Sequence, residues 1–169
     1  EEIPNPSVDI EKTVASGPSA TANEDEYTIT YNIAVSNTSD DLATYELRDT
    51  LKYGAGADVT NVEVIYGGGE SQNSMLNSDF DGETDYVIIT GKELAAMGGE
   101  SYTVTVTFEV DRTLLTDASV DCEITGEEEG SGLLNTVGVH GDFLSKWDEA
   151  CEEIPNPSVD IEKTVASGP

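Results

Sequence analysis

The two ends of the chain carry the same sequence. Residues 1–18 and residues 152–169 both read EEIPNPSVDIEKTVASGP, without a single difference. Chance does not produce an identity of this length, and the offset between the copies is the size of one ordinary domain. We therefore interpret residues 1–151 as one complete repeat and residues 152–169 as the start of the next, identical repeat. A cloning duplication or a designed fusion is the alternative explanation.

The chain is strongly acidic. It has 35 Asp and Glu residues against 7 Lys and Arg residues, which gives a formal net charge of −28. Nucleic-acid binding and docking on an anionic membrane both need a basic face, so the charge argues against both. A hydrophobic content of 37% argues against disorder. No apolar run approaches the length of a transmembrane helix, so we expect no membrane insertion by this segment.

Alternating apolar and polar residues dominate the chain, as in half-buried strands. Residues 27–35 and 102–110 alternate most regularly, and further strands are predicted near residues 8–14, 43–51, 58–66, 85–90, 118–124 and 133–140. About eight strands with no strong helical period predict an all-β fold, an antiparallel immunoglobulin-like sandwich.

The segments between these strands give four further predictions. Residues 92–97 (KELAAM) are expected to form one helical turn, residues 67–83 a long loop, and residues 127–132 an exposed turn. The IPNP sequence at 3–6 and 154–157 is expected to form a stiff link between repeats, because proline restricts the backbone.

Three polar residues fall in phase with apolar neighbours on different strands. They are Lys12 in VDIEKTV, Asp49 in TYELRDTL and Asn135 in GLLNTVGV. Burying any of them without a partner costs several kcal/mol, so we expect them to meet in the core. Burial lowers the pKa of a lysine and raises that of an aspartate. A neutral Lys12 amine could then attack the Asn135 carbonyl, polarised by a protonated Asp49, and expel ammonia. The product is an isopeptide bond that would tie the first strand to the last.

Other arrangements of these residues remain open. Lys12 could extend its amine to solvent at the edge of the sandwich. Asp49 and Asn135 could form hydrogen bonds with backbone groups at strand ends. Lys12 and Asp49 could also form a plain buried salt bridge. Lys163 repeats Lys12 in the second copy of the sequence. If strands are exchanged between repeats, Asn135 could instead join Lys163 and make the array a covalent polymer.

This constellation resembles the intramolecular isopeptide bonds of Gram-positive surface proteins, and is closest to the CnaA-type domains of collagen adhesins and pilins. The chain also resembles the bacterial DUF11 repeat domains of cell-surface proteins. That resemblance lies in DIEKTV, YTITYNIAVSNTSDD, LRDTL, YTVTVTFEVD and LLNTVGV. It implies an extracellular location at the cell surface or cell wall.

The chain has two cysteines, Cys122 and Cys151. An even count in a surface-like domain favours a disulfide, and the DUF11 resemblance supports one here. Closing this loop of about 28 residues would contribute roughly 3–4 kcal/mol. Two buried free thiols are the alternative, and zinc is disfavoured because the single histidine, His140, is expected to be exposed.

One loop has part of a calcium-binding pattern. Asn77, Asp79 and Asp81 occupy alternate positions, and Asp85 follows. The glutamate expected at the twelfth position is absent, because Ile88 stands there. Acidic loops are usually only solvated, so calcium is one of two interpretations. A weaker candidate is a calcium joint between repeats, formed by Glu1, Glu2 and Asp9 with Glu152 and Glu153.

Near-identical repeats favour a structural spacer, as in a stalk, adhesin or filament, whose partners are neighbouring copies of itself. Another domain of such a protein could bind a host or matrix protein.

The sequence has no motif of a turnover enzyme, so bond formation would be a single autocatalytic event without an organic cofactor. Trp147 is expected to pack at the repeat junction. Two alternatives remain: a ligand-binding adhesin module that uses the 67–83 loop with its single aromatic, Phe80, and an acidic S-layer or envelope repeat.

Overall fold

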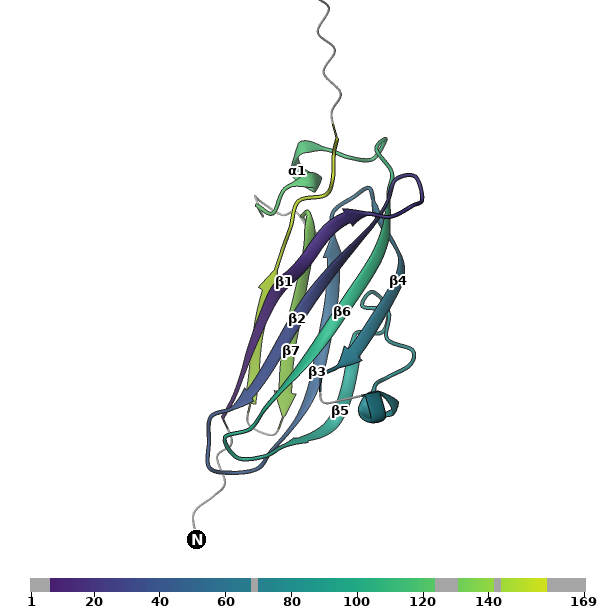
Figure 1. Cartoon of the computed structure of the whole chain (residues 1–169). Coiled ribbons are helices and arrows are strands. Elements are labelled where there is room, and N and C mark those ends of the chain that lie inside the picture. The colour runs from purple at the N-terminus through teal and green to yellow at the C-terminus, as the bar shows by residue number, and fades with distance from the viewer. Residues whose placement is uncertain (1–6, 68–69, 124–130, 142–143, 158–169) are drawn as a thin grey trace, which may run out of the picture.

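The computed structural model describes residues 7–67, 70–123, 131–141 and 144–157. These residues form two four-stranded antiparallel sheets, packed face to face (Figure 1). The first sheet has the order β1 (Val8–Ala20), β2 (Glu26–Asn37), β6 (Gly99–Val110), β4 (Ala57–Tyr66). The second has the order β5 (Val87–Leu94), β3 (Ala43–Tyr53), β7 (Leu133–Gly141), β8 (Leu144–Ala150).

The prediction of an all-β sandwich is confirmed, and the strand order is that of an immunoglobulin-like domain. Strands β1, β2, β6 and β4 correspond to the A-B-E-D sheet of the constant type, and β3, β7 and β8 correspond to C-F-G. Strand β5 adds a fourth strand beside β3. Edge strands β1 and β8 lie on the same side of the sandwich, and edge strands β4 and β5 lie on the other.

The core lies between the sheets and follows the alternation in the sequence. Because successive side chains point to opposite faces of a strand, every second residue is buried along most of β2, β3 and β6. The fully buried positions include Ile29, Tyr31, Ile33 and Val35 of β2, Tyr102, Val104, Val106 and Phe108 of β6, Leu47 of β3, and Leu133 and Val139 of β7.

The predicted strand near 118–124 is wrong. Its first part is the short helix α1 (Asp117–Val120), whose N-cap Thr116 accepts a hydrogen bond from the backbone of Ser119, and the Ser119 hydroxyl bonds back. This capping box stabilises a helical turn where the apolar alternation alone suggests a strand. The eighth strand is instead β8. No helix among the described residues is long and apolar enough to cross a membrane.

The predictions between strands also need correction. The helical turn expected at 92–97 is wrong, because β5 continues to Leu94, which pairs with Ala43 of β3. The 67–83 loop contains the 3-10 helix η1 (Glu70–Met75). Of the turn expected at 127–132, residues 127–130 lie outside the described part, and Ser131 is buried rather than exposed.

The chain enters and leaves the sandwich at opposite ends. Strands β1 and β8 both run upward in Figure 1, so β1 starts at the lower end and residues 151–157 leave at the upper end, beside α1. The IPNP sequence at 154–157 is more than a link between repeats, because the Ile154 side chain is 2% exposed and belongs to the core. The other IPNP copy, residues 3–6, lies outside the described residues, so its role as a link stays a prediction.

Candidate functional site: a buried Lys–Asp–Asn cluster

The three inward-facing polar residues come from three strands and lie between the two sheets. Lys12 is on β1, Asp49 on β3 and Asn135 on β7. Their exposed fractions are 4%, 0% and 0%. The prediction that all three face the core is confirmed. The prediction that Asn135 lies on the last strand is wrong, because β8 follows β7.

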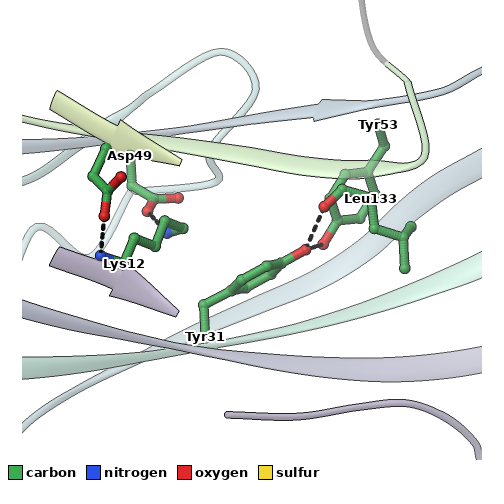
Figure 2. A network of polar contacts seen from close by, with 6 residues as sticks. Lys12, Tyr31, Asp49, Tyr53 and Leu133 are labelled. Carbon is green, nitrogen blue, oxygen red and sulfur yellow. Dashed lines mark hydrogen bonds and ion pairs between the residues drawn. The ribbon is translucent and has the colours of Figure 1, made fainter. Parts of the chain in front are cut away.

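Lys12 and Asp49 form a buried ion pair across the sandwich (Figure 2). The Lys12 Nζ contacts Asp49 Oδ2, and both side chains are fully buried. The same Nζ lies 4.9 Å from the centroid of the Tyr31 ring. The amine is therefore held between a carboxylate and an aromatic face, with no bulk water around it.

Asn135 lies beside Asp49 on the neighbouring strand. In the pairing of β3 with β7, Asp49 is opposite Val137 and Leu51 is opposite Asn135. Asp49 and Asn135 are thus diagonal neighbours on one face of the sheet. The Asn135 amide is near enough to Asp49 to lower the pKa of its carboxyl. The amide nevertheless makes no hydrogen bond of acceptable geometry. The two groups are adjacent without being properly paired.

Some buried polar atoms of the cluster have no hydrogen-bond partner. Among the described residues, the buried side-chain atoms without a hydrogen-bond partner are Asp49 Oδ1, Asn135 Oδ1 and Asn135 Nδ2. Each such buried polar atom costs about 1–3 kcal/mol. All three atoms belong to the two residues that, with Lys12, form the cluster.

Burial shifts the two ionisable groups toward their neutral forms. Desolvation lowers the pKa of Lys12, against the opposing charges of Asp49 and Asp148. Desolvation also raises the pKa of Asp49, against the opposing effects of Lys12 and Asn135. Transfer of one proton from the ammonium to the carboxylate removes both buried charges, and leaves a nucleophilic amine beside a carboxylic acid.

Tyrosine hydroxyls hold β7 against the opposite sheet next to this cluster. The Tyr31 hydroxyl donates to the carbonyl oxygen of Leu133 at 2.8 Å and lies 3.0 Å from the Tyr53 hydroxyl (Figure 2). Burial raises the pKa of both tyrosines, so they stay neutral donors. Because Leu133 is two residues before Asn135, this contact fixes the start of the strand that carries the amide. The sequence marks Tyr31 as inward-facing but does not reveal its partner.

The edge strands β1 and β8 are joined by polar contacts beside the cluster. The backbone N–H of Lys12 donates to Asp148 Oδ2 at 2.6 Å, and Lys146 forms an ion pair with Asp9. Sequence analysis did not identify Asp148, because β8 itself was not predicted. These contacts hold the backbone of β1 against the second sheet at the residue that carries the amine.

The predicted disulfide between Cys122 and Cys151 is present, with the two Cα atoms 5.9 Å apart. It joins the segment after α1 to the segment after β8. The 28 residues that this bond encloses include all of β7, so Asn135 lies inside a covalently closed loop.

The calcium prediction stays untested. Asn77 donates its amide to Asp85 Oδ2, and its Oδ1 accepts from the backbone of Asp79. Asp81 accepts from the Thr84 hydroxyl and from three backbone N–H groups, which lowers its pKa. No group of three His, Cys, Asp or Glu side chains that could hold a metal ion gathers within the described ranges. For the joint between repeats, Glu1 and Glu2 lie outside those ranges.

Of the remaining predicted residues, those that the structure describes do not belong to the cluster. Lys163 falls in the undescribed segment 158–169. His140 is half-buried rather than exposed, with Nδ1 3.4 Å from the Ser145 hydroxyl. Phe80 is buried in the core, so it is not free to bind a ligand from the 67–83 loop. Trp147 is 72% exposed, and its contact with a following repeat stays a prediction.

Neither a protein-family model nor a curated protein matches the chain. The function is therefore argued from the geometry of the cluster and from the repeated sequence.

Proposed function

We propose that the protein is a structural repeat of an extracellular stalk, adhesin or filament, locked by an isopeptide bond between Lys12 and Asn135. The observation that carries this proposal is the buried cluster, with an ion pair beside an unpaired amide. A domain that needed only stability would do as well with apolar residues at these positions, because a buried ion pair is weak evidence for stability.

The chemistry balances within the cluster. Lys12 gives one proton to Asp49, and the neutral Nζ attacks the side-chain carbonyl carbon of Asn135. The carboxylic acid of Asp49 hydrogen-bonds the developing oxyanion. Asp49 then relays a proton from Nζ to the departing amide nitrogen, which leaves as ammonia. One C–N bond forms and one breaks, and no oxidant or metal is consumed.

The product would satisfy the atoms that now lack partners. The Asn135 Nδ2 leaves with the ammonia. The protonated Asp49 can donate to the Asn135 oxygen, and the new amide N–H can donate to the other Asp49 oxygen. Two buried charges and three unpaired polar atoms are thereby replaced by a neutral, hydrogen-bonded amide, which favours the reaction. Exclusion of water protects the bond from hydrolysis.

The position of the bond suits a mechanical role. Force on a tandem array enters through β1 and leaves through the segment after β8, at opposite ends of the sandwich. A bond from β1 to β7 joins the strand that receives the load to the disulfide-closed loop next to the exit. The disulfide also supports an extracellular location, because such bonds persist in oxidising environments. The resemblance to DUF11 and CnaA-type domains agrees with this function.

The decisive test is the intact mass of the purified protein under reducing conditions. We expect the mass to fall short of the sequence by one ammonia, and a peptide joining Lys12 to Asn135 after digestion. Lys12→Ala and Asp49→Ala should each restore the missing ammonia. Lys163→Ala is the matched control, since Lys163 has the same sequence neighbours as Lys12, and it should leave the deficit unchanged. A wild-type protein of full mass that is folded would overturn the covalent lock. Loss of the deficit in Lys163→Ala alone would instead indicate exchange between repeats.

A second candidate function is ligand binding on the outer face of the second sheet. An open groove of about 590 Å³ is lined there by residues that include Lys52, Tyr86, Trp147 and two carboxylates, Glu83 and Glu149, while Arg48 pairs with Glu46. Lys52 makes no ion pair with any described residue, and Trp147 is largely exposed. Exposed aromatic rings suit a sugar better than the 67–83 loop does, and the two carboxylates favour a neutral sugar over an acidic one. Titration with a neutral oligosaccharide should show binding that Trp147→Ala abolishes, while absence of binding to the wild type removes this candidate.

A further inference from the structure

The first residues of the second repeat are built into the described domain. The backbone N–H of Leu133 donates to the carbonyl of Glu152 at 2.7 Å, and the N–H of Ile154 donates to the carbonyl of Val120 at 2.9 Å. The Ile154 side chain is 2% exposed and packs within the main core. The sequence period ends at Cys151, but the packing of the domain continues beyond it.

The receiving site is shaped for this segment. Gly132 has a φ of +55°, and a Cβ at this position would lie 2.7 Å from the Glu152 carbonyl oxygen. Only glycine accepts both this conformation and this close approach. The disulfide from Cys122 to Cys151 anchors the segment immediately before it docks. Backbone pairing, a buried side chain and a covalent anchor thus act on residues 151–154.

The identity of the two sequence copies extends this contact to the whole array. Residues 152–157 repeat residues 1–6 without change. We propose that the EEIP segment at the start of each repeat completes the fold of the preceding repeat, so that residues 1–4 of this chain are recognised by the site of a preceding copy, formed by the equivalents of Val120, Gly132 and Leu133. The inference rests on the tandem-array part of the proposed function and is independent of the isopeptide bond.

Docking of residues 152–154 on this domain makes the joint to the next repeat short and stiff. Val159 is the sequence equivalent of Val8, where β1 begins, so four residues separate docked Ile154 from the next sandwich. Two of the four are prolines, which restrict the backbone. Arg112 also contacts this segment, with Nη1 3.4 Å from the Pro157 carbonyl oxygen. A segment held this way cannot act as a flexible linker.

The chain contains its own matched control for the docking step. Ile154→Ala removes a buried side chain, while Ile3→Ala changes the same residue between the same neighbours. Ile154→Ala should lower the thermal midpoint by roughly 5–15 °C and speed hydrogen exchange at the amides of residues 133 and 154. Ile3→Ala should change neither, because the site formed by Val120, Gly132 and Leu133 is already occupied by residues 152–154. Unchanged exchange and midpoint in Ile154→Ala would overturn the docking.

The joint itself is tested on a protein of two complete repeats. Spin labels at the exposed position of Glu63 in each repeat should give a narrow distance distribution. Ile154→Ala at the junction should broaden it, because the anchoring side chain is lost. A broad distribution in the unmodified two-repeat protein would overturn the stiff joint. Intact mass, measured on the same samples, reports the isopeptide bond separately, so failure of either proposal can be told from failure of the other.

Discussion

At the scale of single residues, the buried cluster lowers the free energy of unfolding as long as its side chains have not reacted. Lys12 and Asp49 lose their hydration, and the Asn135 amide finds no partner. Breaking such a pair by removing one partner leaves an uncompensated buried charge, which typically costs 3–5 kcal/mol. The pH dependence of a variant that lacks the lysine therefore reports directly on the buried acid.

In Lys12→Ala, the pKa of Asp49 should be raised further, because burial raises it already and the opposing charge of the lysine is gone. In the unfolded chain the pKa of Asp is about 3.9. Between that value and the raised folded pKa, the folded state binds more protons than the unfolded state. The free energy of unfolding should therefore fall as the pH rises through this window.

Denaturant titrations over a pH series measure this dependence. The control is the double variant Lys12→Ala, Asp49→Asn, which should lack the downward slope contributed by this site. A Lys12→Ala protein whose slope matches that of the double variant would show that Asp49 is ionised or solvated in the folded state.

The inward orientation of Lys12, Asp49 and Asn135 could be predicted, because a strand period of two fixes the face of each residue. Their spatial neighbours could not. The partner of the Tyr31 hydroxyl is a backbone carbonyl on another strand, and backbone partners leave no mark in the sequence. The docking of residues 152–154 could not be predicted either, because it depends on backbone pairing with Val120 and Leu133.

At the scale of elements, polar contacts bridge both open sides of the sandwich. On the β1–β8 side, Asp148 and Lys146 reach β1. On the other side, the Glu100 carboxylate accepts from the Tyr45 and Tyr66 hydroxyls and pairs with Lys92 at 3.0 Å. Edge strands are prone to pair with other chains, and side-chain bridges with charged residues oppose this.

Sequence analysis missed the elements β8 and α1, because in both the alternation of apolar and polar residues does not reflect the conformation. In β8, Lys146, Trp147 and Asp148 stand consecutively, so no period of two is apparent. Its strand conformation is imposed by pairing with β7. The α1 turn has a strand-like apolar pattern, but its capping box decides the conformation. Both exceptions flank the disulfide, which holds a region with few regular backbone bonds.

Replacing Cys122 with serine should therefore lower stability substantially. The bond closes a loop with a sequence separation of 29 residues, and the chain-entropy account assigns such a loop about 3–4 kcal/mol. Calorimetry should show a thermal midpoint lower by roughly 7–15 °C. Wild-type protein with reductant is the matched comparison and should shift by a similar amount. If neither changes, the loop is already held by the docking of residues 152–154.

At the scale of the whole molecule, the two covalent bonds would determine how far a repeat can extend under load. The force enters at β1 and reaches Lys12 within a few residues. With an isopeptide bond it passes directly to Asn135, and then through the disulfide-closed loop to Cys151. Residues 13–121 would carry no load at all, so most of the sandwich could not be unfolded by pulling. The disulfide alone protects only the segment between its two cysteines.

Pulling single repeats through their ends distinguishes these load paths by length. A chain of about 150 residues without cross-links extends to about 500 Å, at about 3.3–3.6 Å per residue. With the disulfide alone, the limit is about 400 Å, and with the isopeptide bond it is about 100 Å. We expect the short limit for the wild type, the intermediate one for Lys12→Ala, and the longest for Lys12→Ala with reductant. A wild type that extends as far as Lys12→Ala would show that β1 and β7 are not covalently joined, and the domain would resist force only through its hydrogen bonds and core.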